Sequence, residues 1–83
     1  MADLTMAQAV VQAAKYIGAA LVMGLGALGP ALGEGSIGSR AMEAMSRQPE
    51  MVGAITTRMI LADAITETTG LYALLIAFMI LLF

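Results

Sequence analysis

The residues best suited to chemistry lie in one stretch, residues 65–72, which reads ITETTGLY. It places the carboxylate of Glu67 beside threonine hydroxyls and the ring of Tyr72, and no charged residue occurs from position 68 to position 83. A carboxylate at the centre of a bilayer costs roughly 2.5–3.5 kcal/mol on insertion scales, so it needs a partner or a proton. Glu67 is therefore the first candidate for a functional group.

The composition indicates an integral membrane protein. Of 83 residues, 60% are hydrophobic and 12% are charged, and the mean hydropathy is +0.90, which leaves too little polar surface for a soluble globule. Without cysteine or histidine, disulfides, thiolate metal sites and the usual near-neutral acid–base group are excluded. The net charge of −2 argues against nucleic acid as a partner. No nucleotide motif occurs, so we expect no enzyme activity in the chain alone.

The chain is predicted to form a single domain over residues 1–83, an all-α transmembrane hairpin. Helical patterning runs over about 5–45, and its uncharged core from Tyr16 to Gly33 is close to the ~20 residues needed to cross a bilayer. A polar break at about 46–50 contains Pro49, which disfavours helical geometry at Gln48. A second apolar helix is expected over about 51–82. The acidic start, residues 1–3, is unlike the basic start of a removed signal.

The basic residues predict the orientation of this hairpin. Arg40, Arg47 and Arg58 flank the polar loop, whereas Lys15 alone marks the other side. The positive-inside bias then places the loop in the cytoplasm and both termini outside, as a multi-pass protein of the cell inner (plasma) membrane.

Small residues recur along the first helix and predict close helix packing. Residues two apart on a helix point about 200° away from each other, so the small residues divide into two stripes on opposite faces. Small residues at four-residue spacing let membrane helices approach closely. Two opposed stripes favour a neighbour on each side and hence a closed ring of copies. One stripe contains Gly24, Ala27, Ala31 and Gly35, and the other contains Gly26, Gly29 and Gly33.

A second carboxylate, Glu34, lies at nearly the same depth as Glu67. They are fourteen residues before and nineteen after Gln48, or roughly 21 and 28 Å along their helices. Two carboxylates in a site of low dielectric constant cannot both stay ionised, so they share a proton or hold a cation between them. Na⁺ prefers oxygen ligands, by the same logic as other hard cations.

Other oxygen-bearing groups near Glu67 could complete a cation site. Thr68 offers a hydroxyl, Ile65 its backbone carbonyl, and Tyr72 can hydrogen-bond a carboxylate. The alternative is that Thr68 and Thr69 bond backbone carbonyls one turn back, which we favour for Thr69 only. Asp63, one turn from Glu67, could be protonated, paired with a neighbouring hairpin or part of an access route. Arg58 is expected to extend its charge to the membrane interface.

Three features at matching spacing carry a resemblance over nearly the whole chain. They are Gly29-Pro30-Ala31-Leu32-Gly33-Glu34-Gly35, Arg47-Gln48-Pro49-Glu50, and Glu67 eighteen residues after Pro49. With these features the sequence resembles the c subunit of F-type ATP synthases, whose hairpins form a homo-oligomeric ring. The resemblance implies that Glu67 is the ion carrier, that the ring turns against the a subunit in membrane lipid, and that Arg47, Gln48 and Pro49 contact the central-stalk subunits gamma and epsilon. The family's glycine repeat is altered here by Ala27 and Ala31.

The resemblance also bears on the coupling ion. Sodium-type members carry Gln or Glu on the first helix, a hydroxyl directly after the carrier carboxylate and a tyrosine five residues after it. Glu34, Thr68 and Tyr72 occupy these positions, and Ile65 stands where the family uses a backbone carbonyl. The expected function is therefore Na⁺ translocation coupled to ATP synthesis or hydrolysis, with Na⁺ at Glu34, Ile65, Thr68 and Glu67. The alternative is the same ring with H⁺; a small ion channel or a structural hairpin is a weaker rival.

Overall fold

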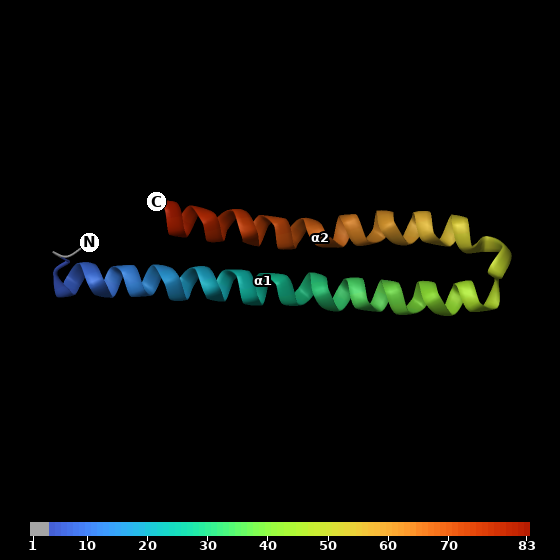
Figure 1. Cartoon of the computed structure of the whole chain (residues 1–83), viewed down its shortest axis with the longest axis horizontal. Helices are drawn as coiled ribbons and strands as arrows, with labels where there is room; N and C mark the ends of the chain where they lie inside the picture. The colour runs from blue at the N-terminus through green and yellow to red at the C-terminus, as the bar shows by residue number, and fades with distance from the viewer. Residues whose placement is uncertain (1–3) are drawn as a thin grey trace.

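The computed structural model describes residues 4–83, which form two long antiparallel helices and a short turn (Figure 1). Helix α1 spans Met6–Arg47, the 3₁₀ turn η1 spans Pro49–Met51, and helix α2 spans Val52–Leu82. The acidic start at residues 1–3 lies outside the described residues. The predicted all-α transmembrane hairpin is confirmed, with α1 ending two residues beyond the expected position 45.

Local chemistry fixes both ends of α1. Thr5 caps the helix, because its hydroxyl accepts from the backbone N–H of Gln8 (3.1 Å) while the Gln8 side chain accepts from the N–H of Thr5 (2.9 Å). At the other end Gln48 leaves helical geometry, with φ −132° and ψ 71°, as expected of a residue before proline. Pro49 then starts η1, so the chain reverses within a few residues.

The hairpin is long enough to cross a bilayer and extend beyond it. Its principal extents are 65 × 16 × 16 Å, whereas the hydrocarbon layer is about 30 Å thick. Both helices are long and apolar enough to span a membrane. The first turns of α1 extend past the C-terminal end of α2 (Figure 1). Membrane-spanning segments therefore occupy only part of each helix.

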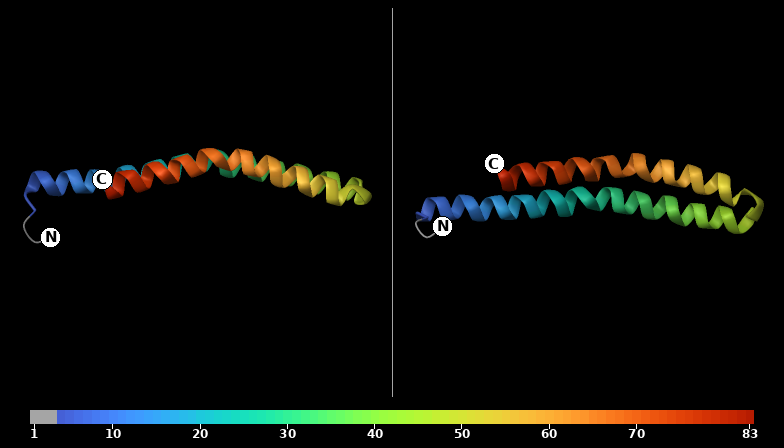
Figure 2. Two further views of the ribbon diagram at one scale, coloured as in Figure 1. Left: turned by 90° about the horizontal axis from the view of Figure 1, so that it is seen from above. Right: turned by 45° about the horizontal axis from the view of Figure 1, so that its top comes forward.

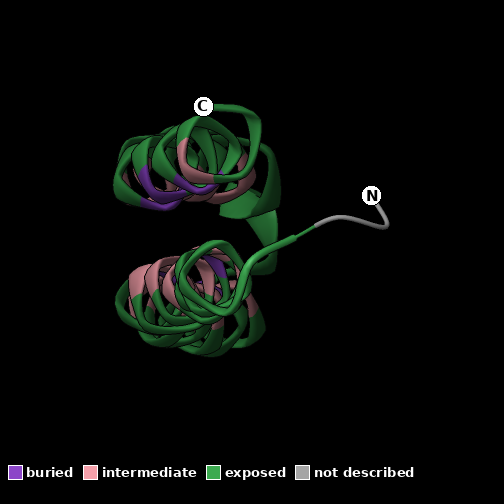
Figure 3. Cartoon of the chain, turned by 90° about the vertical axis from the view of Figure 1, so that its left-hand side faces the viewer, coloured by how far each residue is buried: buried purple, intermediate pink, exposed green. Residues whose placement is uncertain are grey.

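Small residues form the contact between the two helices. The buried residues all lie on the facing sides, and the rest of each helix is half-buried or exposed (Figure 3). A Cβ added to Gly26 would collide with the Cβ of Ala73, and one added to Gly33 would lie 2.9 Å from Cγ2 of Thr66. Close approach of the backbones therefore depends on glycine at both positions. The buried set comprises Ala19, Pro30, Ala41, Gly70, Ala73 and Ala77.

This contact corrects the prediction that both small-residue stripes meet neighbouring copies. Gly26 and Gly33 pack against the chain's own α2, so that part of the prediction is wrong. A Cβ added to Gly29, from the same stripe, would have nothing within 4 Å, and the same holds for Gly24 and Gly35. These positions remain open for a neighbour, and the exposed stripe still contains Ala31.

The two helices bend together at about mid-length (Figure 2). Pro30 lies inside α1 and cannot donate to the carbonyl of Gly26, which is a recognised cause of helix bending. Its ring is buried against α2 near Gly70, where its Cγ lies 3.6 Å from the Cβ position of that glycine. Pro30 is therefore part of the helix contact as well as a bend.

Candidate ion-binding site

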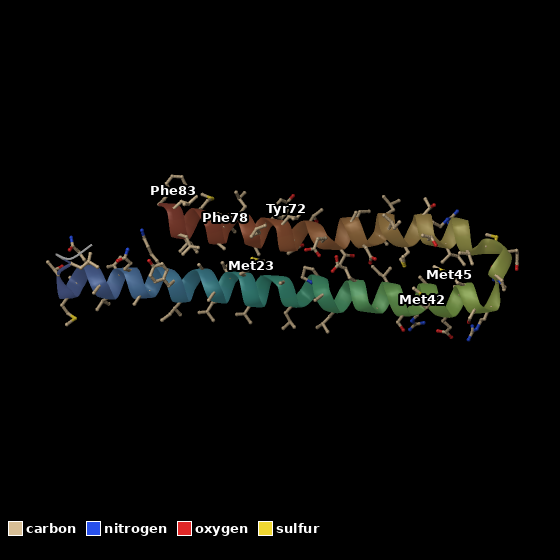
Figure 4. The ribbon with its side chains drawn as sticks, in the orientation of Figure 1. Met23, Met42, Met45, Tyr72, Phe78 and Phe83 are labelled. Atoms are coloured by element: carbon tan, nitrogen blue, oxygen red, sulfur yellow. The ribbon has the colours of Figure 1, made fainter. Side chains whose placement is uncertain are left out.

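The structure brings Glu34 and Glu67 together at mid-length of the hairpin. Their carboxyl groups lie within hydrogen-bonding reach of each other across the contact between α1 and α2. Both residues are half-buried, and oxygen atoms gather between the helices in this region (Figure 4). A hydrogen bond between two carboxyl groups requires a proton on one of them. A hydrogen-bonded pair of this kind would carry at most one negative charge.

Space for the Glu67 carboxyl is provided by Gly70. A Cβ at this buried position would lie 2.7 Å from Oε1 and 3.4 Å from Cδ of Glu67. An alanine here would therefore displace the carboxyl group from its position beside Glu34. Sequence reasoning missed this role of Gly70, for which the signal available was a glycine three residues after the carboxylate.

Thr68 and Ile65 form a second pair of oxygens on an exposed part of α2. The Thr68 hydroxyl donates to the Ile65 carbonyl over 2.8 Å, which is the backbone bond considered as the alternative to ligation. A hydroxyl that donates to a carbonyl keeps lone pairs for a cation. Both residues are exposed, with the Ile65 side chain 63% accessible, so this pair does not meet Glu34 within the hairpin.

Tyr72 lies on the same side of α2 as Ile65. Its side chain is 65% exposed and extends away from α1 (Figure 4). Within residues 4–83 its hydroxyl makes no hydrogen bond. Tyr72 and Glu67 are therefore not hydrogen-bonded to each other within the described hairpin.

Three further polar residues lie near these groups. Thr69 was expected to bond a backbone carbonyl, but no such bond is present in the described chain; Thr66 makes one instead, to Ala62 (2.9 Å). Asp63 is half-buried and close enough to Glu34 to interact electrostatically, and its Oδ1 is enclosed without a hydrogen-bond partner in the described hairpin. No group of three or more acidic residues within residues 4–83 has the geometry to hold a metal ion.

The polar turn presents its side chains to solvent. Arg47 pairs with Glu43 on its own helix, with Nη2 2.6 Å from Oε1, and both side chains are largely exposed. Gln48 and Pro49 are exposed as well. Nothing in the described hairpin covers this turn, so a partner has free access to it.

The sequence matches a known protein family over most of its length. Residues 17–80, which include both helices' membrane-spanning parts and the turn, match the family model for the C subunit of ATP synthase. The chain belongs to the ATP synthase c-subunit family. It is an ion-translocating rotor subunit of F-type ATP synthase and is not catalytic by itself, as the sequence predicted.

Similar members come from several bacteria. The ATP synthase c subunit of Thermotoga petrophila is 68% identical over 77 residues, covering 93% of this chain and 91% of that protein. The c subunit of Petrotoga mobilis is 62% identical over 67 residues, or 81% and 70% of the two chains. The second ATP synthase c subunit of Cereibacter sphaeroides is 46% identical over 71 residues, or 86% of each chain.

Proposed function

We propose that this rotor subunit carries Na⁺ on Glu67, in a site completed by the neighbouring hairpin of a ring. One hairpin supplies the Glu34–Glu67 pair, and the next supplies the Ile65 carbonyl and the Thr68 hydroxyl. The observation that carries this proposal is the 2.8 Å oxygen pair of Thr68 and Ile65, which is exposed and separate from the carboxyl pair.

Helix geometry supports the division of the site between two copies. Glu67 and Ile65 are two residues apart and point about 200° away from each other, so they lie on opposite flanks of α2. In a ring with head-to-tail contacts, one flank of each copy meets the other flank of the next. The carboxyl flank of one hairpin then faces the Thr68 flank of its neighbour.

The donor set suits a monovalent cation. Two carboxyl oxygens, a carbonyl and a hydroxyl are hard ligands of the kind that Na⁺ prefers. If Glu34 keeps a proton, the Glu67 carboxylate alone neutralises the bound Na⁺. A neutral site can then face lipid without the cost of a bare charge. Tyr72 of the neighbour is suited to donate a hydrogen bond to Glu67.

H⁺ is the second candidate for the coupling ion, and one observation favours it. The two carboxyl groups lie close enough to share one proton within a single hairpin, without any ligand from a neighbour. In that case the Thr68–Ile65 bond is a local backbone contact only. A channel or a purely structural hairpin fits less well, because the polar groups cluster at one depth.

The partners proposed for this protein follow from its exposed surfaces. The a subunit would meet the ring at the depth of Glu67, where release of the ion needs a fixed positive group. The turn with Arg47, Gln48 and Pro49 would contact gamma and epsilon on the cytoplasmic side, with both termini outside. The basic residues near the turn are consistent with its cytoplasmic position. Membrane lipid would cover the remaining apolar surface.

The experiment that tests the ion assignment replaces Thr68 with valine. In the whole complex reconstituted in vesicles, Thr68→Val should lower the apparent Na⁺ affinity of ATP-driven Na⁺ uptake by roughly tenfold or more, a loss of the size seen when metal-site groups are removed. Thr69→Val is the matched control and should leave Na⁺ uptake unchanged. Equal Na⁺ affinity in the Thr68→Val and parent complexes would contradict the ligand role.

A further inference from the structure

A second set of charges, separate from the carboxyl pair, lies nearer the turn. Arg40 of α1 and Arg58 of α2 both line one groove between the helices, with a volume of about 300 Å³. The other lining residues are apolar, and neither arginine has an ion-pair partner within residues 4–83, where the one ion pair joins Arg47 and Glu43. Both arginines are exposed, so their charges are available to a negative partner outside the hairpin.

The arginines and the acidic residues occupy opposite flanks of the hairpin. On α2, Arg58 and Asp63 are five residues apart and so point about 140° away from each other. On α1, Arg40 and Glu34 are six apart, or about 120°. The two arginines therefore share one groove, whereas Asp63 and Glu34 both lie toward the other flank of the hairpin.

Asp63 is an acidic residue without a partner in the described hairpin. Its Oδ1 is enclosed and has no hydrogen-bond partner in the described hairpin, and no ion pair joins it to a basic side chain of residues 4–83. An ionised carboxylate in this position is unfavourable unless a positive charge lies beside it. Within the described hairpin no basic group is on that flank.

We propose that Arg58 of one hairpin pairs with Asp63 of the next, across the contact between copies in the ring. This inference rests on the proposed ring, in which opposite flanks of adjacent copies meet. If adjacent hairpins stand at the same height in the membrane, Arg58 of one and Asp63 of the next are separated by about 7.5 Å along the helix axis. An extended arginine side chain can span this distance. Glu67 lies about 13.5 Å from Arg58 along the same axis, beyond such a contact. The rotor's own arginine therefore neutralises Asp63 and leaves the carrier free.

A double-mutant cycle on the assembled ring tests the pair. Arg58→Gln and Asp63→Asn should each speed dissociation of the purified ring in detergent by roughly 2- to 100-fold, because each leaves a buried charge without a partner. The double variant should dissociate no faster than either single variant. The charge-swapped variant, Arg58→Glu with Asp63→Lys, should assemble where single reversals do not.

Arg47→Gln is the matched control, because it removes an arginine whose partner lies on its own helix. It should change dissociation little and show no coupling to Asp63→Asn. Additive effects of the Arg58 and Asp63 changes would overturn the proposed pair. So would an effect of Arg58→Gln that requires added anionic lipid, since the groove would then hold a lipid phosphate. A parent chain that forms no ring would contradict the proposed function itself.

Discussion

At the scale of single residues, the site depends on how the Glu67 carboxyl is held as much as on its charge. Gly70 leaves the space that Oε1 occupies, and Pro30 packs beside the same glycine. The carboxyl can therefore reach Glu34 across the helix contact.

This arrangement predicts the effect of Gly70→Ala. The added Cβ would lie 2.7 Å from Oε1, so the carboxyl must move away from Glu34. We expect Na⁺ affinity to fall by roughly tenfold, or about 1.4 kcal/mol, in Na⁺-protection assays of the ring. Gly53→Ala is a suitable control, since nothing lies within 4 Å of its Cβ position. Unchanged affinity in Gly70→Ala would show that the carboxyl position is not limiting.

The sequence predicted the charged and hydroxyl residues of the site better than the space around them. Glu34 and Glu67 could be placed at similar depth because helical rise is regular. The role of Gly70 could not be predicted, because it depends on where a side chain three residues away comes to rest. The hydrogen bond of Thr68 was equally open, since ligation and backbone bonding use the same hydroxyl.

At the scale of the helices, the hairpin is held by a narrow contact of small residues. Gly26 lies against Ala73 and Gly33 against Thr66, which fixes the antiparallel register and brings the two carboxylates level. From the sequence, the division of glycines into two stripes was predictable. Which stripe meets α2 was not, because both faces offer small residues, and only the packed hairpin distinguishes Gly33 from Gly29.

The Gly26–Ala73 contact predicts that exchanging these two residues preserves the stability of the hairpin. Gly26→Ala should destabilise the hairpin by about 1–3 kcal/mol, because its new methyl group collides with that of Ala73. Combining Gly26→Ala with Ala73→Gly moves the methyl group to the other helix and should restore most of the loss. Thermal unfolding of the detergent-solubilised chain, followed by circular dichroism, measures both. Failure of the double variant to recover would argue against this close contact.

At the scale of the whole molecule, the proposed Na⁺ site needs groups from more than one hairpin. It presents carboxyls on one flank and the Thr68–Ile65 oxygens on a different face, with most of its large apolar side chains exposed. Membership of the c-subunit family explains these exposed surfaces, because the hairpins of that family pack side by side in a rotor ring. The sequence predicted the hairpin and the turn from composition and Pro49, but the contacts between copies lie beyond a single chain.

The most direct test of the shared Na⁺ site is carbodiimide labelling of Glu67 in the assembled ring and in separated hairpins, across pH and with or without Na⁺. Na⁺ should slow labelling in the ring, where the neighbour's oxygens are present, and have little effect on separated hairpins. Protection should weaken as the pH falls, because protons compete for the same carboxylate. Absence of Na⁺ protection in the ring at every pH would contradict the proposed sodium site and favour H⁺ as the coupling ion.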